Sequence, residues 1–175
     1  MWKAVKEMHR MRKKSCRGVS PLDAVGAAML VAGPAMLVRA GQGRREIRGE
    51  LAAQEITFPD EGRIPDDLAA YAGRRVETGR QARAYARLIK RNLAGATGGR
   101  TYAQLGAGLA EARANGGDDE KLAELQRTAF TGEMLRASLM SAYQAWQLTL
   151  LVSCLGGMTT ALGAGLLASG APGRV

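Results

Sequence analysis

The chain has 175 residues, enough for one modest domain, and a net charge of +9 that is unevenly distributed. The one histidine, His9, excludes zinc sites built on several histidines and catalytic triads that need a histidine elsewhere in the chain. Cys16 lies in a basic tail and Cys154 in an apolar stretch, so neither a disulfide nor a metal site is predicted. We expect no catalytic residues, no cofactor and no metal.

Residues 1–18 form a basic N-terminal tail, with seven basic side chains against Glu7 alone. The tail directly precedes an apolar stretch. Its charge therefore indicates a topology signal and a contact with anionic lipids more than a nucleic-acid site. We expect no nucleic-acid partner.

Residues 19–38 are predicted as the first transmembrane helix. Ser20 is suited to the N-cap, Pro21 to the first helical position, and Asp23 follows the cap by three residues. The cap pattern favours a structural Asp23 at the headgroup boundary, although an intramembrane carboxylate would be a functional candidate. Pro34 is expected to kink the helix or to free a carbonyl.

A cleaved signal peptide is the alternative for the same stretch, because a basic region precedes it and small residues follow near Ala40 and Gly41. The apolar run is longer than is usual in signal peptides, and Arg39 occupies the junction. We therefore favour a retained anchor.

Residues 39–144 are predicted as an extramembrane helical domain. The helix should resume after Gly41 and Gly43, and a turn-rich connector should follow at residues 57–65. Asp66 is expected to cap a short helix that Gly73 closes.

The clearest amphipathic helix is predicted over residues 78–94. Thr78 and Gln81 have the spacing of a capping box. One apolar stripe is expected, made of Ala82, Tyr85, Ile89 and Leu93. The remaining surface carries Arg80, Arg83, Arg87, Lys90 and Arg91. These cations either form a solvated face or contact anionic headgroups or an acidic partner.

A further helix is predicted over residues 101–114, with a capping box at Thr101 and Gln104 and with Tyr102, Leu105 and Leu109 facing inward. The last helix should start near Glu120, capped by Asp118 or Asp119. Its expected inner stripe is Leu122, Leu125, Ala129, Leu135 and Leu139, and Thr131-Gly132 is a candidate bend.

Residues 145–169 are predicted as the second transmembrane helix, continuous with the helix before it. No residue between Arg136 and Arg174 is charged. Residues 146–169 would make a helix of about 36 Å, enough to cross a hydrocarbon core of about 30 Å. Tyr143 and Trp146 fit an aromatic belt at the interface.

Both apolar stretches carry small residues four apart, a spacing that allows close helix approach. These are Ala24, Ala28 and Ala32 in the first and Gly157, Ala161 and Gly165 in the second. We expect the two ridges to meet in an antiparallel pair, or one of them to face another protein.

The predicted fold is therefore all-α: two transmembrane helices flank a small extramembrane helical domain, and residues 170–175 form a C-terminal tail. The basic tail predicts cytoplasmic N- and C-termini in the cell membrane, with residues 39–144 extracytoplasmic.

The segments ELAAQEITFPD, YAGRRVETGRQARAYARLIKRNL and GGRTYAQL, within residues 50–105, resemble small two-span integral membrane proteins of actinobacteria. The resemblance implies the two-span layout and no particular activity.

The sequence thus indicates a non-enzymatic membrane protein, an accessory, scaffolding or interaction component whose partners are lipids and another membrane protein or itself. A transporter or channel subunit acting as an oligomer is the alternative, with Asp23 and the threonines of the second span lining a path. No small-molecule substrate is indicated.

Overall fold

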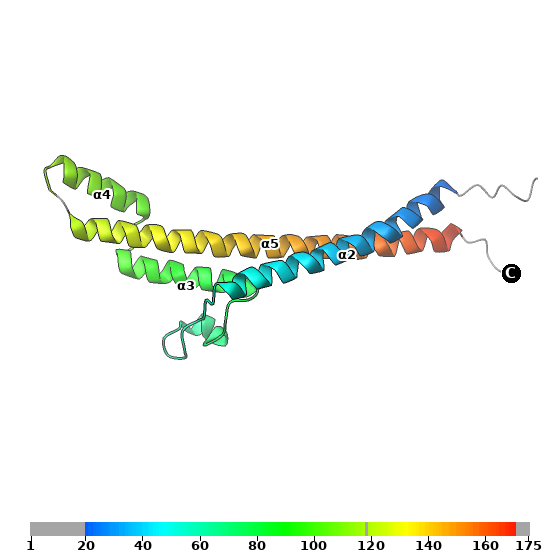
Figure 1. Cartoon of the computed structure of the whole chain (residues 1–175), viewed down its shortest axis with the longest axis horizontal. Coiled ribbons are helices and arrows are strands. Elements are labelled where there is room, and N and C mark those ends of the chain that lie inside the picture. The colour runs from blue at the N-terminus through cyan, green and yellow to red at the C-terminus, as the bar shows by residue number, and fades with distance from the viewer. Residues whose placement is uncertain (1–19, 118, 171–175) are drawn as a thin grey trace, which may run out of the picture. The chain divides into compact units, whose positions relative to one another are not determined.

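The computed structural model describes residues 20–117 and 119–170, and within them the protein is all-helical, without strands. The elements are α2 (Pro21–Ala53), the short 3-10 helix η1 (Asp66–Tyr71), α3 (Gly79–Thr97), α4 (Tyr102–Ala114) and α5 (Glu120–Gly170) (Figure 1). The predicted basic tail and most of the predicted C-terminal tail lie outside the described residues.

The described chain divides into two units. One consists of residues up to 39 and from 152 onward, and the other of residues 40–151. Helices α2 and α5 each contribute a segment to both units.

Helix α2 begins as its cap pattern predicts. The Ser20 hydroxyl accepts a hydrogen bond from the Leu22 backbone N–H at 3.3 Å, and Asp23 lies in the first turn. The predicted break after Gly41 and Gly43 is wrong, because α2 continues to Ala53. A glycine costs a helix about 1 kcal/mol, which packing readily offsets. Ala40 and Leu51, on either side of the two glycines, are both buried.

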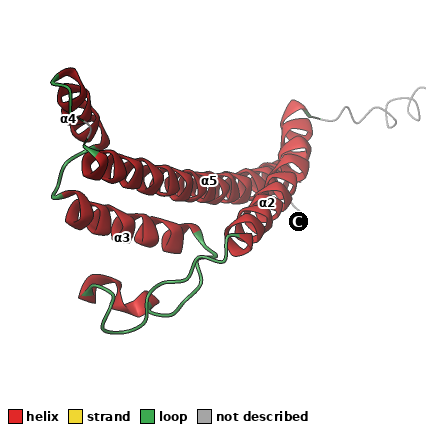
Figure 2. Cartoon of the chain, turned by 60° about the vertical axis from the view of Figure 1, so that its left-hand side comes forward, coloured by secondary structure: helices red, strands yellow, loops and turns green. Residues whose placement is uncertain are grey.

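The connector between α2 and α3 folds back on itself (Figure 2). An isolated antiparallel bridge joins Thr57 to Arg75, and the Phe58 N–H donates to the Arg74 carbonyl at 2.9 Å. Helix η1 starts after Pro65 without a side-chain cap, so the prediction that Asp66 is the cap is wrong. Proline fixes φ near the value that the turn needs, and the Pro65 carbonyl accepts from the Leu68 N–H at 2.8 Å.

The core of the unit formed by residues 40–151 lies where α2, the connector, α3 and α5 meet. Phe58 is its centre: its ring stacks on Tyr71 at 5.2 Å and meets Tyr85 edge-on at 5.0 Å. The buried core residues are Leu51, Phe58, Ile64, Leu68, Val76, Ala82, Ala84, Ala86, Leu88, Ile89 and Leu139.

Helix α3 has the predicted capping box, with Thr78 accepting from the Gln81 N–H and the Gln81 side chain accepting from Thr78. Its buried surface is wider than the predicted single stripe. Ala84 and Leu88 are buried as well as Ala82 and Ile89. Both sides are covered because α3 packs against α5 on one side and against the connector on the other.

Helix α4 also has its predicted capping box, at Thr101 and Gln104. Leu105 and Leu109 are buried, but Tyr102 is exposed rather than inward and contacts Phe130 of α5, with the ring centres 5.8 Å apart. In both cartoon views α3 and α4 lie on different sides of α5 (Figures 1 and 2).

Helix α5 starts at Glu120 as predicted, and the Asp119 carboxylate accepts from the Leu122 N–H at 3.0 Å. Asp118, the other predicted cap, lies outside the described residues. Helix α5 continues without interruption through Thr131-Gly132, the candidate bend, and the missing side chain of Gly132 makes room for Leu93 of α3. Of the predicted inner stripe, Ala129 and Leu139 are buried, whereas Leu135 is exposed.

Candidate functional site

In the unit made of residues up to 39 and from 152, α2 and α5 meet through four glycines. A Cβ on Gly163 would lie 2.7 Å from the Gly26 carbonyl oxygen, and a Cβ on Gly156 would lie 2.8 Å from the Gly33 carbonyl oxygen. These distances are too short for any side chain. We call Gly26, Gly33, Gly156 and Gly163 the glycine seam.

The seam has a fixed antiparallel register. Gly26 faces Gly163 and Gly33 faces Gly156, so seven residues forward along α2 match seven residues backward along α5. A seven-residue period keeps contact residues on one side of two supercoiled helices. The Thr160 hydroxyl, packed on Gly33, donates to the Gly156 carbonyl of its own helix at 2.8 Å and is thereby satisfied within the contact.

The seam predicted from the sequence is therefore wrong in its residues. Ala24, Ala28 and Ala32 on α2 and Gly157, Ala161 and Gly165 on α5 are all exposed. Added side chains on Gly157 or Gly165 would meet no atom within 4 Å. The physical reason is the period: the predicted ridges repeat every four residues, whereas the helices contact every seven residues. That one of the two small-residue ridges faces another protein stays a prediction.

The seam predicts different effects for adjacent glycines. Gly33→Ala and Gly156→Ala should each destabilise the protein by about 1–3 kcal/mol, because the new methyl group overpacks a contact made with backbone atoms. Gly157→Ala and Gly165→Ala should leave stability unchanged or slightly raised, since alanine favours helix.

Thermal unfolding of the four purified variants in one detergent tests this contrast. Equal losses for all four substitutions would contradict the seam as the contact between α2 and α5.

The second candidate feature is the cationic face of α3, formed by Arg80, Arg83, Arg87, Lys90 and Arg91. All five side chains are exposed, as the sequence predicts for a polar face. Residues 78–110 contain six basic residues and no acidic one. The spacing of three and four residues keeps the five cations on one side of the helix.

Two of the five cations are held by neighbours. Arg83 donates to the Tyr143 hydroxyl at 2.9 Å and lies over that ring, and Arg91 forms a two-pronged ion pair with Asp67 at 2.6 and 2.7 Å. Within residues 20–117 and 119–170, Arg80, Arg87 and Lys90 are in no ion pair. Most of the positive charge of the face is therefore uncompensated.

Helix α3, which carries the cationic face, runs along α5. Gly79 packs on Trp146, Arg83 reaches Tyr143, and Leu93 fills the space at Gly132. As the residue number rises along α3 from Gly79 to Leu93, the number of the contacted residue falls along α5 from Trp146 to Gly132. Helix α3 therefore lies antiparallel to α5. Tyr143 and Trp146, predicted as interfacial aromatics, both contact α3.

The Asp67–Arg91 pair links η1 to α3 and responds to pH. The hydrogen bonds from Arg91 lower the pKa of the Asp67 carboxyl below its ordinary value of 3.8. A carboxylate whose pKa is lowered by folding stabilises the fold above its unfolded pKa, and that contribution disappears as the pH falls through the lower, folded value. Both side chains are about half exposed, so the effect should be small.

We expect Asp67→Asn to remove part of the loss of stability that acid causes below about pH 4. Arg91→Gln should do the same, and the double variant should add little, because both remove one interaction. Melting temperatures between pH 7 and pH 3 measure this. Identical pH profiles for wild type and both single variants would show that the pair contributes nothing.

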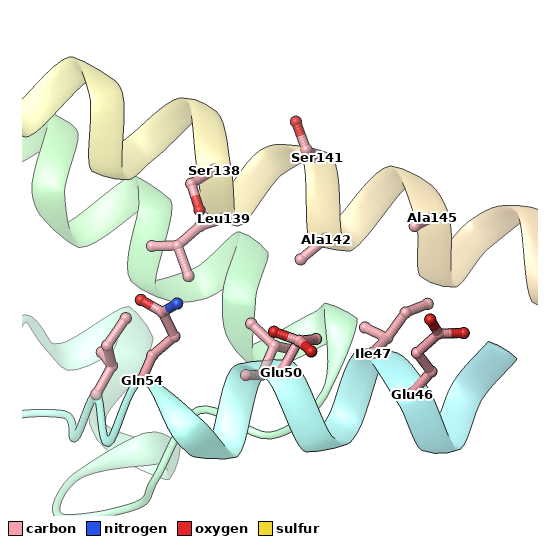
Figure 3. A pocket seen from close by; sticks show the side chains of 11 residues that line it. Glu46, Ile47, Glu50, Gln54, Ser138, Leu139, Ser141, Ala142 and Ala145 are labelled. Atoms are coloured by element: carbon pink, nitrogen blue, oxygen red, sulfur yellow. The ribbon is translucent and has the colours of Figure 1, made fainter.

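A groove of about 440 Å³ lies between the end of α2 and the middle of α5 (Figure 3). Ile47 and Leu51 of α2 and Leu139 and Ala142 of α5 make it apolar. Its polar lining consists of Glu46, Glu50, Gln54, Ser138 and Ser141. In Figure 3 Leu139 and Ala142 point toward α2, whereas Ser141 points away from it.

Three carboxylates in or beside the connector form ion pairs. Asp60 pairs with Arg63, Glu55 with Arg75, and Asp67 with Arg91. In the described ranges, no group of three histidine, cysteine or acidic side chains could hold a metal ion.

No protein-family model, curated protein or solved structure matches this chain. The resemblance to actinobacterial two-span proteins thus stays a prediction.

Proposed function

We propose that this chain is a two-span integral membrane protein that acts as an accessory, scaffolding or interaction component and not as an enzyme. The observation that carries the proposal is the exposure of its two most apolar segments. Helices α2 and α5 each contain an 18-residue window long and apolar enough to cross a membrane, yet only 11% of each window is buried.

A core helix of a soluble protein has the opposite property, since its apolar side chains are mostly buried. Here Val31 of α2 is 74% exposed, and Met158 of α5 is 62% exposed. Hydrocarbon chains of lipids are the environment in which such a surface is stable.

The glycine seam supports a retained first span. A signal sequence near the N-terminus would also be long and apolar, but cleavage after it would remove Gly26 and Gly33 from their contacts with Gly163 and Gly156. Backbone contact through small residues is how membrane helices associate where the hydrophobic effect gives no drive. We infer that both termini are cytoplasmic and that residues 39–144 are extracytoplasmic, from the basic tail.

The cationic face of α3 is the surface that we assign to contact outside the bilayer. If Trp146 lies at the membrane–water interface, Arg80 lies at the same depth, and Arg91 lies about 16 Å farther from the membrane along α5. Electrostatic attraction decays over about 8 Å at physiological ionic strength. Anionic lipid headgroups would therefore attract only the cations of α3 that lie nearest the membrane. An acidic partner beside α3 accounts for the rest.

The membrane assignment predicts that the full chain stays with membranes after alkaline carbonate extraction and is released only by detergent. Its intact mass should include residues 1–38. With Cys16 and Cys154 replaced by serine, Gly117→Cys should react with an impermeant maleimide added to whole cells. Recovery in the carbonate supernatant would refute the spans, and labelling of Gly117→Cys only after lysis would refute the orientation alone.

The assignment of α3 predicts that Arg87→Glu combined with Lys90→Glu abolishes recovery of the partner that co-purifies with a tagged wild-type chain. The matched control is Arg74→Glu, which reverses an exposed cation outside α3. Quantitative mass spectrometry of mild-detergent extracts measures the difference. Loss of the partner in both variants, or in neither, would show that the cationic face is not the contact.

A further inference from the structure

Three large apolar side chains of α5 are exposed in a part of the helix that carries charged neighbours. Met134 is 52% exposed, Phe130 49% and Leu135 36%. The ion pair of Glu133 and Arg136, at 2.8 Å, lies on the same two turns. Lipid is not expected to cover this stretch, so the three side chains need another cover.

The three positions belong to one heptad pattern. Thr131, Ser138 and Ala145 occupy a positions, and Met134, Ser141 and Leu148 occupy d positions. Phe130 and Leu135 are then the flanking g and e residues, which pair across the interface when two such helices run parallel. One arrangement thus covers all three exposed apolar side chains.

We propose that a second copy of this chain packs in parallel against α5 over residues 130–148. The proposal rests on the membrane assignment above. Two copies inserted in the same orientation must align their α5 helices in parallel, with the two-fold axis along the membrane normal. Residue i of one copy then lies next to residue i of the other.

Charge favours this pairing between residues 130 and 148. Every a and d position there is neutral, so identical residues meet without repulsion. The preceding a and d positions are Glu124 and Arg127. In a parallel pair, Glu124 would face Glu124 of the other copy and Arg127 would face Arg127. Like charges in contact destabilise such a pair. The interface therefore begins after Arg127.

Part of the proposed interface borders the groove between α2 and α5. Ser138, Ser141 and Ala145 all line it. Such small side chains let two helix backbones approach closely. The two α5 helices would therefore approach each other most closely beside the groove, where the a and d residues are smallest. Met134, a larger d residue, would meet Met134 of the other copy outside the groove.

The sequence of α5 continues the pattern toward its C-terminus. Val152 and Thr159 occupy the next two a positions of the heptad, and Leu155 and Leu162 occupy the next two d positions. All four of these residues are neutral, so a second copy would meet no like charges along this stretch either.

Cysteine cross-linking of the full chain in native membranes tests the proposal. In a chain with Cys16 and Cys154 replaced by serine, Ser138→Cys and Ser141→Cys should each form a disulfide-linked dimer on mild oxidation. Gln147→Cys is the matched control, since Gln147 is exposed but occupies a c position on another side of the helix. It should give at least tenfold less dimer.

A second measurement uses charge. Met134→Glu should weaken dimerisation in detergent at least tenfold by light scattering, whereas Gln147→Glu should not change it. Equal cross-linking at residues 138, 141 and 147, or no cross-linking at any of them, would overturn the proposal. Carbonate extraction of the same membranes, scored separately, shows whether the membrane assignment has failed instead.

Discussion

The close approach of the α2 and α5 backbones at the glycine seam is the constraint on which the pairing of these two apolar helix segments depends. A side chain added at any of the four glycines would crowd the backbone of the facing helix, and this fixes which residues of the two helices face each other. Met29, Met36 and Leu167 pack beside these glycines, whereas other large apolar side chains of the same segments, such as Val31 and Met158, are exposed.

A second register, between α3 and α5, organises the unit formed by residues 40–151. It uses different chemistry at each step: the Trp146 ring over Gly79, a hydrogen bond between Arg83 and Tyr143, and Leu93 in the space at Gly132. Glycine again makes room at two of the three steps. Of the α3 cations, Arg83 takes part in this register and Arg91 pairs with Asp67 of η1, whereas Arg80, Arg87 and Lys90 are exposed.

Much of this arrangement follows from local sequence patterns, and the rest does not. The capping boxes at Thr78 and Thr101 and the start of α5 were predicted because a cap depends on residues three apart. The seam was not predicted, because its facing residues are more than 120 positions apart and the sequence contains small residues at both four-residue spacing and the seven-residue spacing of Gly26, Gly33, Gly156 and Gly163. The continuity of α2 past Gly41 and Gly43 depends on packing partners that helix propensity cannot include, whereas the continuity of α5 was predicted.

The position of Trp146 gives the protein an optical signal of its own. Its indole ring lies against Gly79 at the first turn of α3 and within 6.0 Å of the Arg44 guanidinium. Trp2 is the other tryptophan of the chain, so replacing it by phenylalanine would leave Trp146 as the single emitter. Separation of α3 from α5 would bring solvent to the ring, and its emission would shift to longer wavelength. The docking of α3 can thus be followed without any added label.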